Sequence, residues 1–214
     1  MDGKQIFEMI TGLAGGLGLF LFGMKLMSES IEKFAGAKLR KILEFFTKNK
    51  FMGLFVGIIF TGIVQSSSAC TVMVVSFVNS GLMNLYQAVG VIFGANIGTT
   101  VTSLLVSFNL SKYAPIFLLI GVIMIMFFKK QGIVKFGDVL VGFGVLFLGL
   151  SLMSSSMNTL KQSPVIEDIF ASLTNPFIAV LVGFLVTAVI QSSSVTVSIV
   201  LLLAQQGMLN LPIC

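Results

Sequence analysis

Two short polar clusters with the same letters lie inside long apolar stretches of the sequence. They are Gln65-Ser66-Ser67-Ser68 and Gln191-Ser192-Ser193-Ser194. Successive helical residues are turned by about 100°, so the four side chains would surround the axis and no single packing face would hide them. A serine hydroxyl can bond a carbonyl one turn earlier, but an unpaired amide in hydrocarbon is costly. We therefore expect a helix break at both clusters; close packing of small residues is the alternative.

A helix break at membrane depth exposes backbone groups that can bind ions. N–H groups at a helix start, together with serine hydroxyls, suit an oxyanion, whereas carbonyl and hydroxyl oxygens suit a small hard cation. Glutamine offers both a donor and an acceptor, so it can fix the geometry between them. No lysine, arginine or histidine lies near either cluster. A buried anion would therefore need co-bound cations, which predicts cation-coupled transport; a neutral solute would need no such coupling.

A third polar cluster, Gly94-Ala-Asn-Ile-Gly-Thr-Thr-Val-Thr102, interrupts the next apolar stretch. We expect its two glycines, Gly94 and Gly98, to loosen a helix, and Asn96 to supply an amide. Hydroxyl oxygens come from Thr99, Thr100 and Thr102. Glycine and threonine also mediate ordinary helix packing, which is the alternative for this cluster.

Composition places these clusters in a membrane protein. Of the 214 residues 56% are hydrophobic and 10% are charged, and no charged residue occurs from Phe51 to Ser111, which excludes a soluble domain. The apolar stretch from Ile10 lacks the basic region and cleavage site of a signal peptide, so we read it as a retained span. The net charge of +5 fits basic cytoplasmic loops rather than nucleic acid. Two cysteines and no histidine support neither a disulfide framework nor a zinc site.

Six apolar segments follow one another along the chain. A helix needs about 20 apolar residues to cross a bilayer, and four segments are near that length. They are residues 10–27, 85–108, 114–128 and 136–155. Residues 51–78 and 176–204 are each about 28 residues long with a QSSS near the centre, too long for one span and too short for two. We predict that each is a re-entrant hairpin; a hairpin of two short spans has the same parity.

Basic residues predict which loops face the cytoplasm. Lysine and arginine concentrate in residues 28–50 and 129–135, whereas residues 109–113 and 156–175 hold one lysine each. The positive-inside rule then places the first two loops inside and the N-terminus outside, provided that residues 51–78 return to their starting side. Residues 28–50 are partly amphipathic and are expected to lie along the inner leaflet or to form a solvated helix.

The sequence also repeats itself at an offset of 126 residues. Residues 16–85 align with residues 142–211 without a gap, and 20 of the 70 positions are identical. In the predicted topology an odd number of crossings separates equivalent points, so the repeats are inverted relative to the membrane. Inverted repeats are common in secondary transporters, whose substrate sites lie near the midplane.

These motifs resemble the signatures of the type II sodium/phosphate cotransporter family, including its bacterial members. The resemblance implies an all-α membrane protein, an inverted-repeat secondary transporter with two QSSS-containing re-entrant helical hairpins that meet to bind phosphate and sodium. It implies phosphate contacts from Ser66, Ser67, Ser68, Ser192, Ser193 and Ser194. It implies sodium or supporting contacts from Gln65, Asn96, Thr99, Thr100 and Gln191.

The resemblance also implies how the chain is divided. The first transmembrane repeat would be residues 1–135 and the second, inverted repeat residues 136–214. A second G-x-N-I-G-T-T motif would begin at residue 220, so we expect the second repeat to be incomplete in this chain. A second chain or a further C-terminal region would then complete it, and many bacterial members add a PhoU-like domain.

We therefore predict sodium-coupled symport of inorganic phosphate into the cell across the cytoplasmic membrane, with no cofactor besides sodium as the coupling ion. The alternatives are a carrier for another oxyanion or a small neutral solute, and a non-transporting membrane subunit or phosphate sensor. A serine hydrolase is disfavoured because the apolar stretches place no base beside either QSSS. We expect no enzymatic activity.

Overall fold

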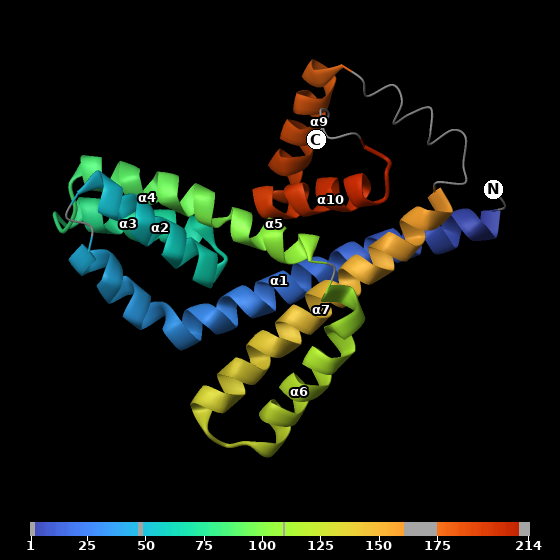
Figure 1. Cartoon of the computed structure of the whole chain (residues 1–214), viewed down its shortest axis with the longest axis horizontal. Coiled ribbons are helices and arrows are strands. Elements are labelled where there is room, and N and C mark those ends of the chain that lie inside the picture. Colours follow the sequence, from blue (N-terminus) through green and yellow to red (C-terminus); the bar gives the residue numbers. More distant parts are fainter. Residues whose placement is uncertain (1–2, 47–48, 109, 161–174, 210–214) are drawn as a thin grey trace. The chain divides into compact units, whose positions relative to one another are not determined.

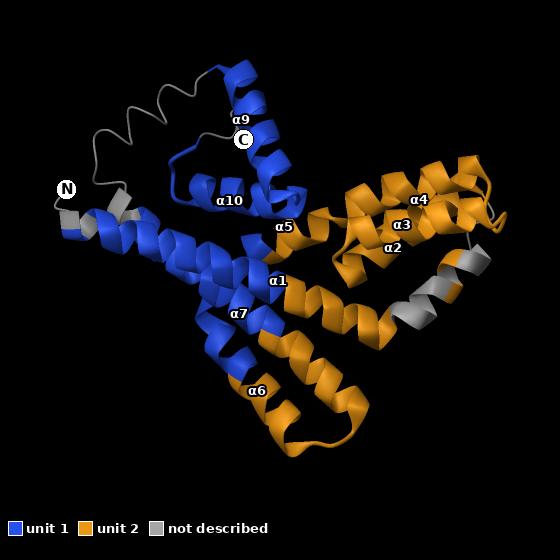
Figure 2. Ribbon diagram, turned by 180° about the vertical axis from the view of Figure 1, so that it is seen from behind, with its two compact units in different colours: residues 1–24, 106–118, 142–214 blue, residues 25–105, 119–141 orange. Residues whose placement is uncertain are grey.

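The computed structural model describes residues 3–46, 49–108, 110–160 and 175–209, and these ranges contain helices and short connections but no strand (Figure 1). The helices are α1 (Gly3–Phe46), α2 (Lys50–Val64), α3 (Ser67–Asn79), α4 (Leu85–Gly98), α5 (Thr100–Ser107), η1 (Leu110–Tyr113), α6 (Ala114–Phe127), α7 (Gln131–Leu160), α9 (Pro176–Ile190) and α10 (Ser193–Gln205). The chain forms two compact units (Figure 2). One comprises residues 1–24, 106–118 and 142–214, and the other residues 25–105 and 119–141.

Four helical segments in the described part of the chain are long and apolar enough to cross a membrane. They are Ile6–Ala35, Leu85–Ser107, Leu110–Phe127 and Gln131–Met157. Each contains or overlaps one of the four predicted spans, so these spans are confirmed as membrane-capable helices. The chain is therefore an all-helical membrane protein within the residues described. The four remaining apolar helices, α2, α3, α9 and α10, have only 13 to 15 residues each.

The first span does not end where the hydropathy ends. We expected a span over residues 10–27 followed by a loop, but α1 continues without interruption to Phe46. Charged residues do not stop a helix: Glu29 lies one turn from both Lys25 and Lys33, with N–O distances of 3.8 and 3.7 Å. Such exposed ion pairs contribute little to helix stability, so the helix propensity of the residues is what keeps this segment helical. The basic residues therefore continue α1, in line with the helical alternative for residues 28–50.

In the second unit, α2 and α4 run parallel at very short distance. A Cβ at Gly53 would lie 3.0 Å from the Gln87 carbonyl oxygen, and one at Gly98 would lie 2.6 Å from the Ile58 carbonyl oxygen. Residue numbers therefore rise together along the two helices. Such an approach is possible only where side chains are absent, the small-residue packing typical of membrane helices.

Because α2 and α4 are parallel, α2 and α3 form a hairpin. The backbone of Lys50, where α2 begins, lies against Gly90 in the second turn of α4. The end of α3 at Asn79 is joined to the start of α4 by only five residues, 80–84. Both open ends of the α2–α3 pair therefore lie near the start of α4. α3 also packs against α4, which completes a three-helix group.

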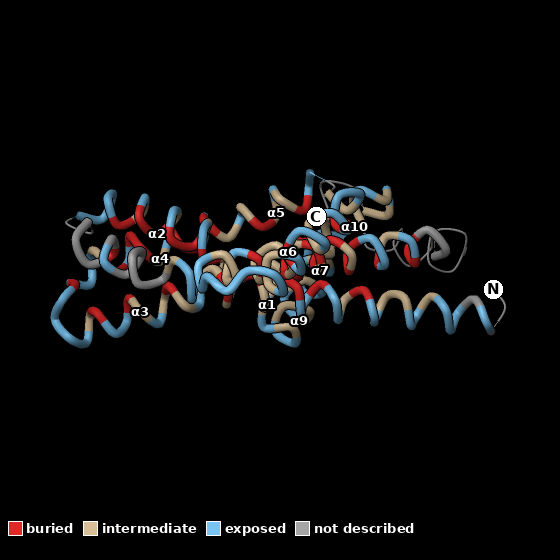
Figure 3. Tube along the Cα trace, turned by 90° about the horizontal axis from the view of Figure 1, so that it is seen from below, coloured by how far each residue is buried: buried red, intermediate tan, exposed pale blue. Residues whose placement is uncertain are grey.

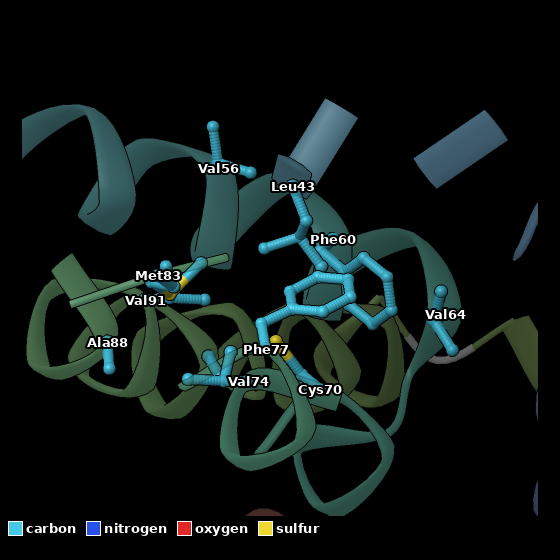
Figure 4. Packing of buried hydrophobic residues seen from close by; sticks show 11 residues of the cluster. Leu43, Val56, Phe60, Val64, Cys70, Val74, Phe77, Met83, Ala88 and Val91 are labelled. Atoms are coloured by element: carbon cyan, nitrogen blue, oxygen red, sulfur yellow. The ribbon is translucent and has the colours of Figure 1, made fainter. Parts of the chain in front are cut away.

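An apolar cluster fills the space inside this group (Figure 4). Its members are Leu43, Val56, Phe60, Val64, Cys70, Val74, Phe77, Met83, Ala88, Val91 and Ala95. Lipid tails are as apolar as these side chains, so close van der Waals packing, rather than escape from water, is what favours the buried arrangement.

In the first unit, α1 and α7 pack antiparallel through glycines. A Cβ at Gly16 would lie 2.9 Å from the Gly149 carbonyl oxygen, and one at Gly23 would lie 2.7 Å from that of Gly142. Adding the repeat offset of 126 to 16 and 23 gives 142 and 149. Residue 16 thus meets the equivalent of residue 23, and residue 23 meets the equivalent of residue 16. This reciprocal pattern is that of a local two-fold axis.

The helix α9 differs from its counterpart α2 in burial, whereas α10, like α3, has several buried residues (Figure 3). No residue of α9 is buried, and Gly183 has no neighbouring atom within 4 Å of a Cβ position. Its equivalent Gly57 lies against the Val91 carbonyl of α4. The face of α9 that corresponds to the α4-packing face of α2 is therefore uncovered in the described part of the chain.

Candidate functional site

Both QSSS clusters interrupt a helix in the same way. α2 ends at Val64 and α3 begins at Ser67, while α9 ends at Ile190 and α10 begins at Ser193. Gln65 has φ 59° and ψ 27°, and Gln191 has φ 58° and ψ 27°. In the described part of the chain these are the two non-glycine residues with positive φ. This left-handed conformation costs about 1–2 kcal/mol in an L-residue, and such strain clusters at functional sites.

Each glutamine bonds back onto the helix that it ends. The Nε2 of Gln65 donates to the Gly62 carbonyl, and the Nε2 of Gln191 donates to the Ala188 carbonyl, each at 2.6 Å. Their backbone N–H groups donate to the carbonyls of Thr61 and Thr187, each at 2.7 Å. The amide nitrogen thus pairs with one of the last carbonyls of the helix, and Oε1 remains to face a partner.

At the first break, two residues far away in sequence hold the structure in place. Thr102, in α5, donates its hydroxyl hydrogen bond to Oε1 of Gln65. Ser28, in α1, donates to the Val64 carbonyl at 2.9 Å, which pairs the last carbonyl of α2. The sequence analysis named Thr102 among the hydroxyls of the third cluster, but it included neither residue among the expected phosphate or sodium contacts. Signals for both existed, since Thr102 closes the GANIGTTVT cluster and Ser28 belongs to a triplet repeated at residues 152–154.

The serines after each glutamine form the start of the next helix. The Ser66 side chain accepts from the Ala69 backbone N–H at 3.2 Å, whereas Ser192 makes no such side-chain cap. Ser67 and Ser193 are the first helical residues, followed by Ser68 and Ser194. N–H groups in the first turn have no acceptor within their own helix. Each break therefore presents unpaired N–H groups and serine hydroxyls at the positive end of a helix.

The glycines of the cluster at residues 94–102 serve close packing as well as the expected interruption of the helix. Gly94 and Gly98 lie against the carbonyls of Leu54 and Ile58 in α2, and α4 ends at Gly98 before α5 begins at Thr100. Thr99 at the junction of α4 and α5 keeps right-handed helical angles, φ −61° and ψ −27°. The helix is thus interrupted next to Gly98 without a bend in its backbone angles, and close packing, the alternative, accounts for the position of both glycines.

The polar side chains of that cluster divide between two roles. Thr99 donates to Ala95 O at 3.0 Å and Thr100 to Ile97 O at 2.7 Å, so both hydroxyls are used within their own helical turn. Asn96 is exposed. Among the described residues no hydrogen bond joins these three to the first break, whereas Thr102 reaches it. The direct partner of Gln65 is therefore Thr102, and not one of the three predicted residues.

A polar cavity of about 380 Å³ lies in the first unit. It is lined by Val106, Ser107, Ser111, Leu150, Ser154, Leu202, Gln205 and Gln206. Gln206, at the C-terminal end of α10, donates its Nε2 to the Ser154 hydroxyl at 2.6 Å. The lining contains hydroxyl and amide groups but no charged side chain, so it suits hydrated ions or small polar solutes.

Comparison with known proteins decides the family. The sequence profile described as Na+/Pi-cotransporter matches residues 19–155 and again residues 151–213. The chain belongs to this Na+/Pi-cotransporter family. The first match of the Na+/Pi-cotransporter profile contains the Gln65 break and the cluster at residues 94–102, and the second contains the Gln191 break. A profile that matches twice agrees with the internal repeat.

Individual relatives of the chain within the Na+/Pi-cotransporter family include bacterial and animal proteins. "Putative inorganic phosphate export protein YjbB" of Escherichia coli K12 is 30% identical over 202 residues, which is 94% of this chain and 37% of that protein. "Uncharacterized protein YqeW" of Bacillus subtilis is 28% identical over 193 residues, 90% of this chain and 62% of that protein. "Sodium-dependent phosphate transport protein 2A" of the rat is 37% identical over 97 residues, 44% of this chain and 15% of that protein. The chain thus spans less than two thirds of these relatives, and no solved structure matches it significantly.

Proposed function

We propose that this chain forms a membrane pathway for sodium-coupled transport of inorganic phosphate, in the direction of uptake. The observation that carries the proposal is the pair of helix breaks at Gln65 and Gln191, which have the same strained backbone angles and the same side-chain hydrogen bond. The family is one of Na+/Pi cotransporters. The residues at the breaks offer the neutral donors and oxygens that this chemistry needs.

Phosphate would bind at the helix starts. The first-turn N–H groups of α3 and α10 point out of the helix, beside the hydroxyls of Ser66, Ser67 and Ser68 and of Ser192, Ser193 and Ser194. Helix starts supply only partial positive charge, equivalent to roughly half a proton charge each. A divalent anion therefore needs additional positive charge in a region without basic side chains, and sodium supplies it.

Sodium would bind at oxygen atoms near each break. Oxygen ligands are the carbonyls at the ends of α2 and α9 and the Oε1 atoms of Gln65 and Gln191. Thr102 orients Oε1 of Gln65. Asn96, Thr99 and Thr100 remain proposed as supporting residues, less than two turns before Thr102 along the helix. No cofactor beyond the coupling ion enters the proposal, and transport requires no chemical step.

The proposed direction of transport depends on coupling to an inward sodium gradient. The name of YjbB refers to phosphate export, whereas the rat protein is named as a sodium-dependent phosphate transport protein. A sodium gradient directed inward drives symport inward, so sodium symport and export are opposed under that gradient. Measuring both directions in one preparation separates the two readings.

We expect radiolabelled phosphate uptake into liposomes containing the chain to require an inward sodium gradient. Ser67→Ala removes one hydroxyl donor to an anion and should weaken phosphate affinity about tenfold, the value of a hydrogen bond to a charged group. Ser76→Ala is the matched control, because Ser76 lies in the same helix and its hydroxyl bonds the Val72 carbonyl.

Four outcomes would contradict the proposal for phosphate uptake. Sodium-independent uptake would remove the coupling, and efflux from preloaded liposomes without sodium-driven uptake would make the protein an exporter. Sulfate or a neutral solute that competes as well as phosphate would indicate another carrier. Sodium-dependent phosphate binding without transport would support the reading as a membrane subunit or sensor.

The hairpin of α2 and α3 supports a re-entrant arrangement. At 1.5 Å per residue these helices are about 22 and 20 Å long, shorter than the hydrocarbon core of about 30 Å. Both open ends of the hairpin lie near the start of α4, so the tip at Gln65 ends within the membrane. The Lys135 ammonium donates to the Lys33 carbonyl at 3.2 Å, in agreement with a common side for the two basic regions.

The second break fits the opposite membrane side. Gln206, directly after α10, bonds Ser154 near the end of α7, and Ser111 lines the same cavity. Ser111 and Ser154 belong to or adjoin the regions that the basic-residue pattern places outside. α10 would therefore return to the outer side, where α9 begins. With the reciprocal glycine contacts of α1 and α7, this supports inverted repeats and an external N-terminus in the proposed cytoplasmic membrane.

Cysteine labelling tests this topology. In a Cys214→Ser background, Lys41→Cys and Leu82→Cys should react with an impermeant maleimide from the same side, because a re-entrant hairpin returns the chain. Ser155→Cys and Met208→Cys should both react from the other side. Both Lys41 and Leu82 are exposed, and Cys70 is buried, so it gives little background. Opposite reactivity within either pair would show that the QSSS segment crosses the membrane.

The open face of α9 supports a further partner in the second repeat. Gly57 packs against α4, but Gly183 contacts nothing in the described residues. An α4-like helix with glycines at helical spacing would complete α9 as α4 completes α2. We propose that a second chain or a further C-terminal region supplies it, with a PhoU-like domain as a further partner.

A further inference from the structure

An apolar groove runs along α2 and α4, away from the QSSS break at Gln65. Its volume is about 650 Å³, within the range of about 300–1,000 Å³ of small-molecule sites. The groove is lined by Lys50, Phe51, Leu54, Leu85, Tyr86, Val89, Gly90 and Phe93. Phe51, Tyr86 and Phe93 are 66%, 82% and 61% exposed, so the aromatic walls have no covering side chains.

One end of this groove is positively charged. The Lys50 ammonium lies 5.3 Å from the centre of the Phe51 ring. None of the described residues forms an ion pair with Lys50, and the sequence contains no acidic residue between Glu44 and Asp138. Lys50 therefore offers an unneutralised charge beside an apolar surface.

The groove also lies at the depth where a lipid headgroup begins. Lys50 starts α2 directly after a basic stretch, and from Phe51 the chain is uncharged for 61 residues, so this end marks the membrane surface. Tyr86, one residue into α4, is typical of that boundary. The aromatic residues then extend from the headgroup level toward the acyl chains.

The internal repeat shows that the charge is not a requirement of the fold. Phe51 has phenylalanine as its equivalent, Phe177, but the equivalent of Lys50 is Pro176. Both residues begin a 15-residue helix, so either satisfies the helix start. The positive charge is thus specific to the first copy, where the groove is.

We propose that this groove binds one anionic phospholipid, with an acyl chain against Phe51, Val89 and Phe93 and the headgroup phosphate at Lys50. Free phosphate is also negatively charged, but it would gain nothing from contact with the predominantly apolar wall. A zwitterionic lipid fits the wall but adds a positive group near Lys50. The anionic lipid satisfies both parts of the groove. This inference is independent of the transported substrate.

The chain contains no tryptophan, so Phe93→Trp places a unique fluorophore in the groove. In vesicles that mix brominated and ordinary lipids, we expect brominated phosphatidylglycerol to compete for the contact about fivefold better than brominated phosphatidylcholine, the value of one lysine near an anionic surface. Lys50→Gln should reduce this preference to about onefold. Millimolar inorganic phosphate should leave it unchanged.

Phe55→Trp is the matched control. Phe55 is 60% exposed, as Phe93 is 61%, but it does not line the groove, and it lies close in depth because α2 and α4 are parallel. The Phe55→Trp variant should show no preference between the two lipids. An equal preference in both variants, or a preference that survives Lys50→Gln, would overturn the proposal. Protection of the Phe93→Trp fluorophore from both brominated lipids would also overturn it and indicate a protein occupant such as a second copy.

Discussion

Replacing Gln65 with glycine is expected to keep the helix break folded but to weaken sodium-dependent phosphate binding by about 30-fold. Two side-chain hydrogen bonds are lost, to the Gly62 carbonyl and from Thr102, and each is worth about 1 kcal/mol. Without the amide, the side-chain oxygen that Thr102 orients is lost as a cation ligand, and only backbone carbonyls remain at the break. Equilibrium binding of labelled phosphate, with sodium or potassium, measures the loss.

The alanine variant separates the side chain from the backbone. Gln65→Ala loses the same hydrogen bonds but keeps the left-handed strain, which glycine relieves by about 1 kcal/mol. We therefore expect Gln65→Gly to be more stable than Gln65→Ala and equally poor in binding. If Gln65→Gly bound phosphate as the unmodified chain does, the glutamine would be only a turn residue. Gln191→Gly extends the comparison to the second break.

The two breaks were predictable because their residues conflict with a continuous helix. Gln65 and its three serines cannot share one packing face, and the same conflict recurs 126 residues later. The observed breaks fall between Val64 and Ser67 and between Ile190 and Ser193, inside the predicted segments. Local pattern and repetition were sufficient here, because hydrogen bonding in a membrane leaves few alternatives.

The third cluster was interpreted less well, because glycine in a sequence has two meanings. Gly94 and Gly98 were expected to loosen a helix; α4 does end at Gly98, but both glycines also allow α2 and α4 to approach closely. Sequence cannot distinguish a glycine that loosens a helix from one that permits close packing unless the facing helix is known. The same limit concealed Thr102 and Ser28, whose roles arise from partners 37 and 36 residues away.

Hydropathy located the first span but not the end of its helix. Residues 28–46 carry charges, so they leave the apolar profile, yet they contain no proline and continue α1. A bilayer boundary and a helix boundary are set by different physics: transfer of side chains from water for the first, and backbone hydrogen bonding and propensity for the second. The basic region therefore indicates which side of the membrane this part of α1 faces, but it does not end the helix.

Replacing Gly57 with alanine is expected to destabilise the protein strongly, whereas the same change at Gly183 is expected to be harmless in this chain by itself, without the helix proposed to cover α9. A Cβ at Gly57 would collide with the Val91 carbonyl and lie 3.0 Å from the Ala95 nitrogen. Backbone atoms cannot rotate away as a side chain can, so α2 and α4 must separate. Overpacking of this kind costs about 1–3 kcal/mol. In a 214-residue chain this lowers the thermal midpoint by about 5 °C.

Gly183 is the repeat equivalent of Gly57, and no atom lies within 4 Å of its Cβ position. Alanine there gains helix propensity of about 1 kcal/mol over glycine, so the thermal midpoint should stay constant or rise. Thermal unfolding in detergent, followed by size-exclusion chromatography, compares the two variants. Equal destabilisation would mean that the α9 face is covered like that of α2, and no destabilisation at Gly57 would refute the close α2–α4 contact. The difference in thermal midpoint between these two equivalent substitutions thus reports the α2–α4 contact, which has no counterpart at α9 within the described residues.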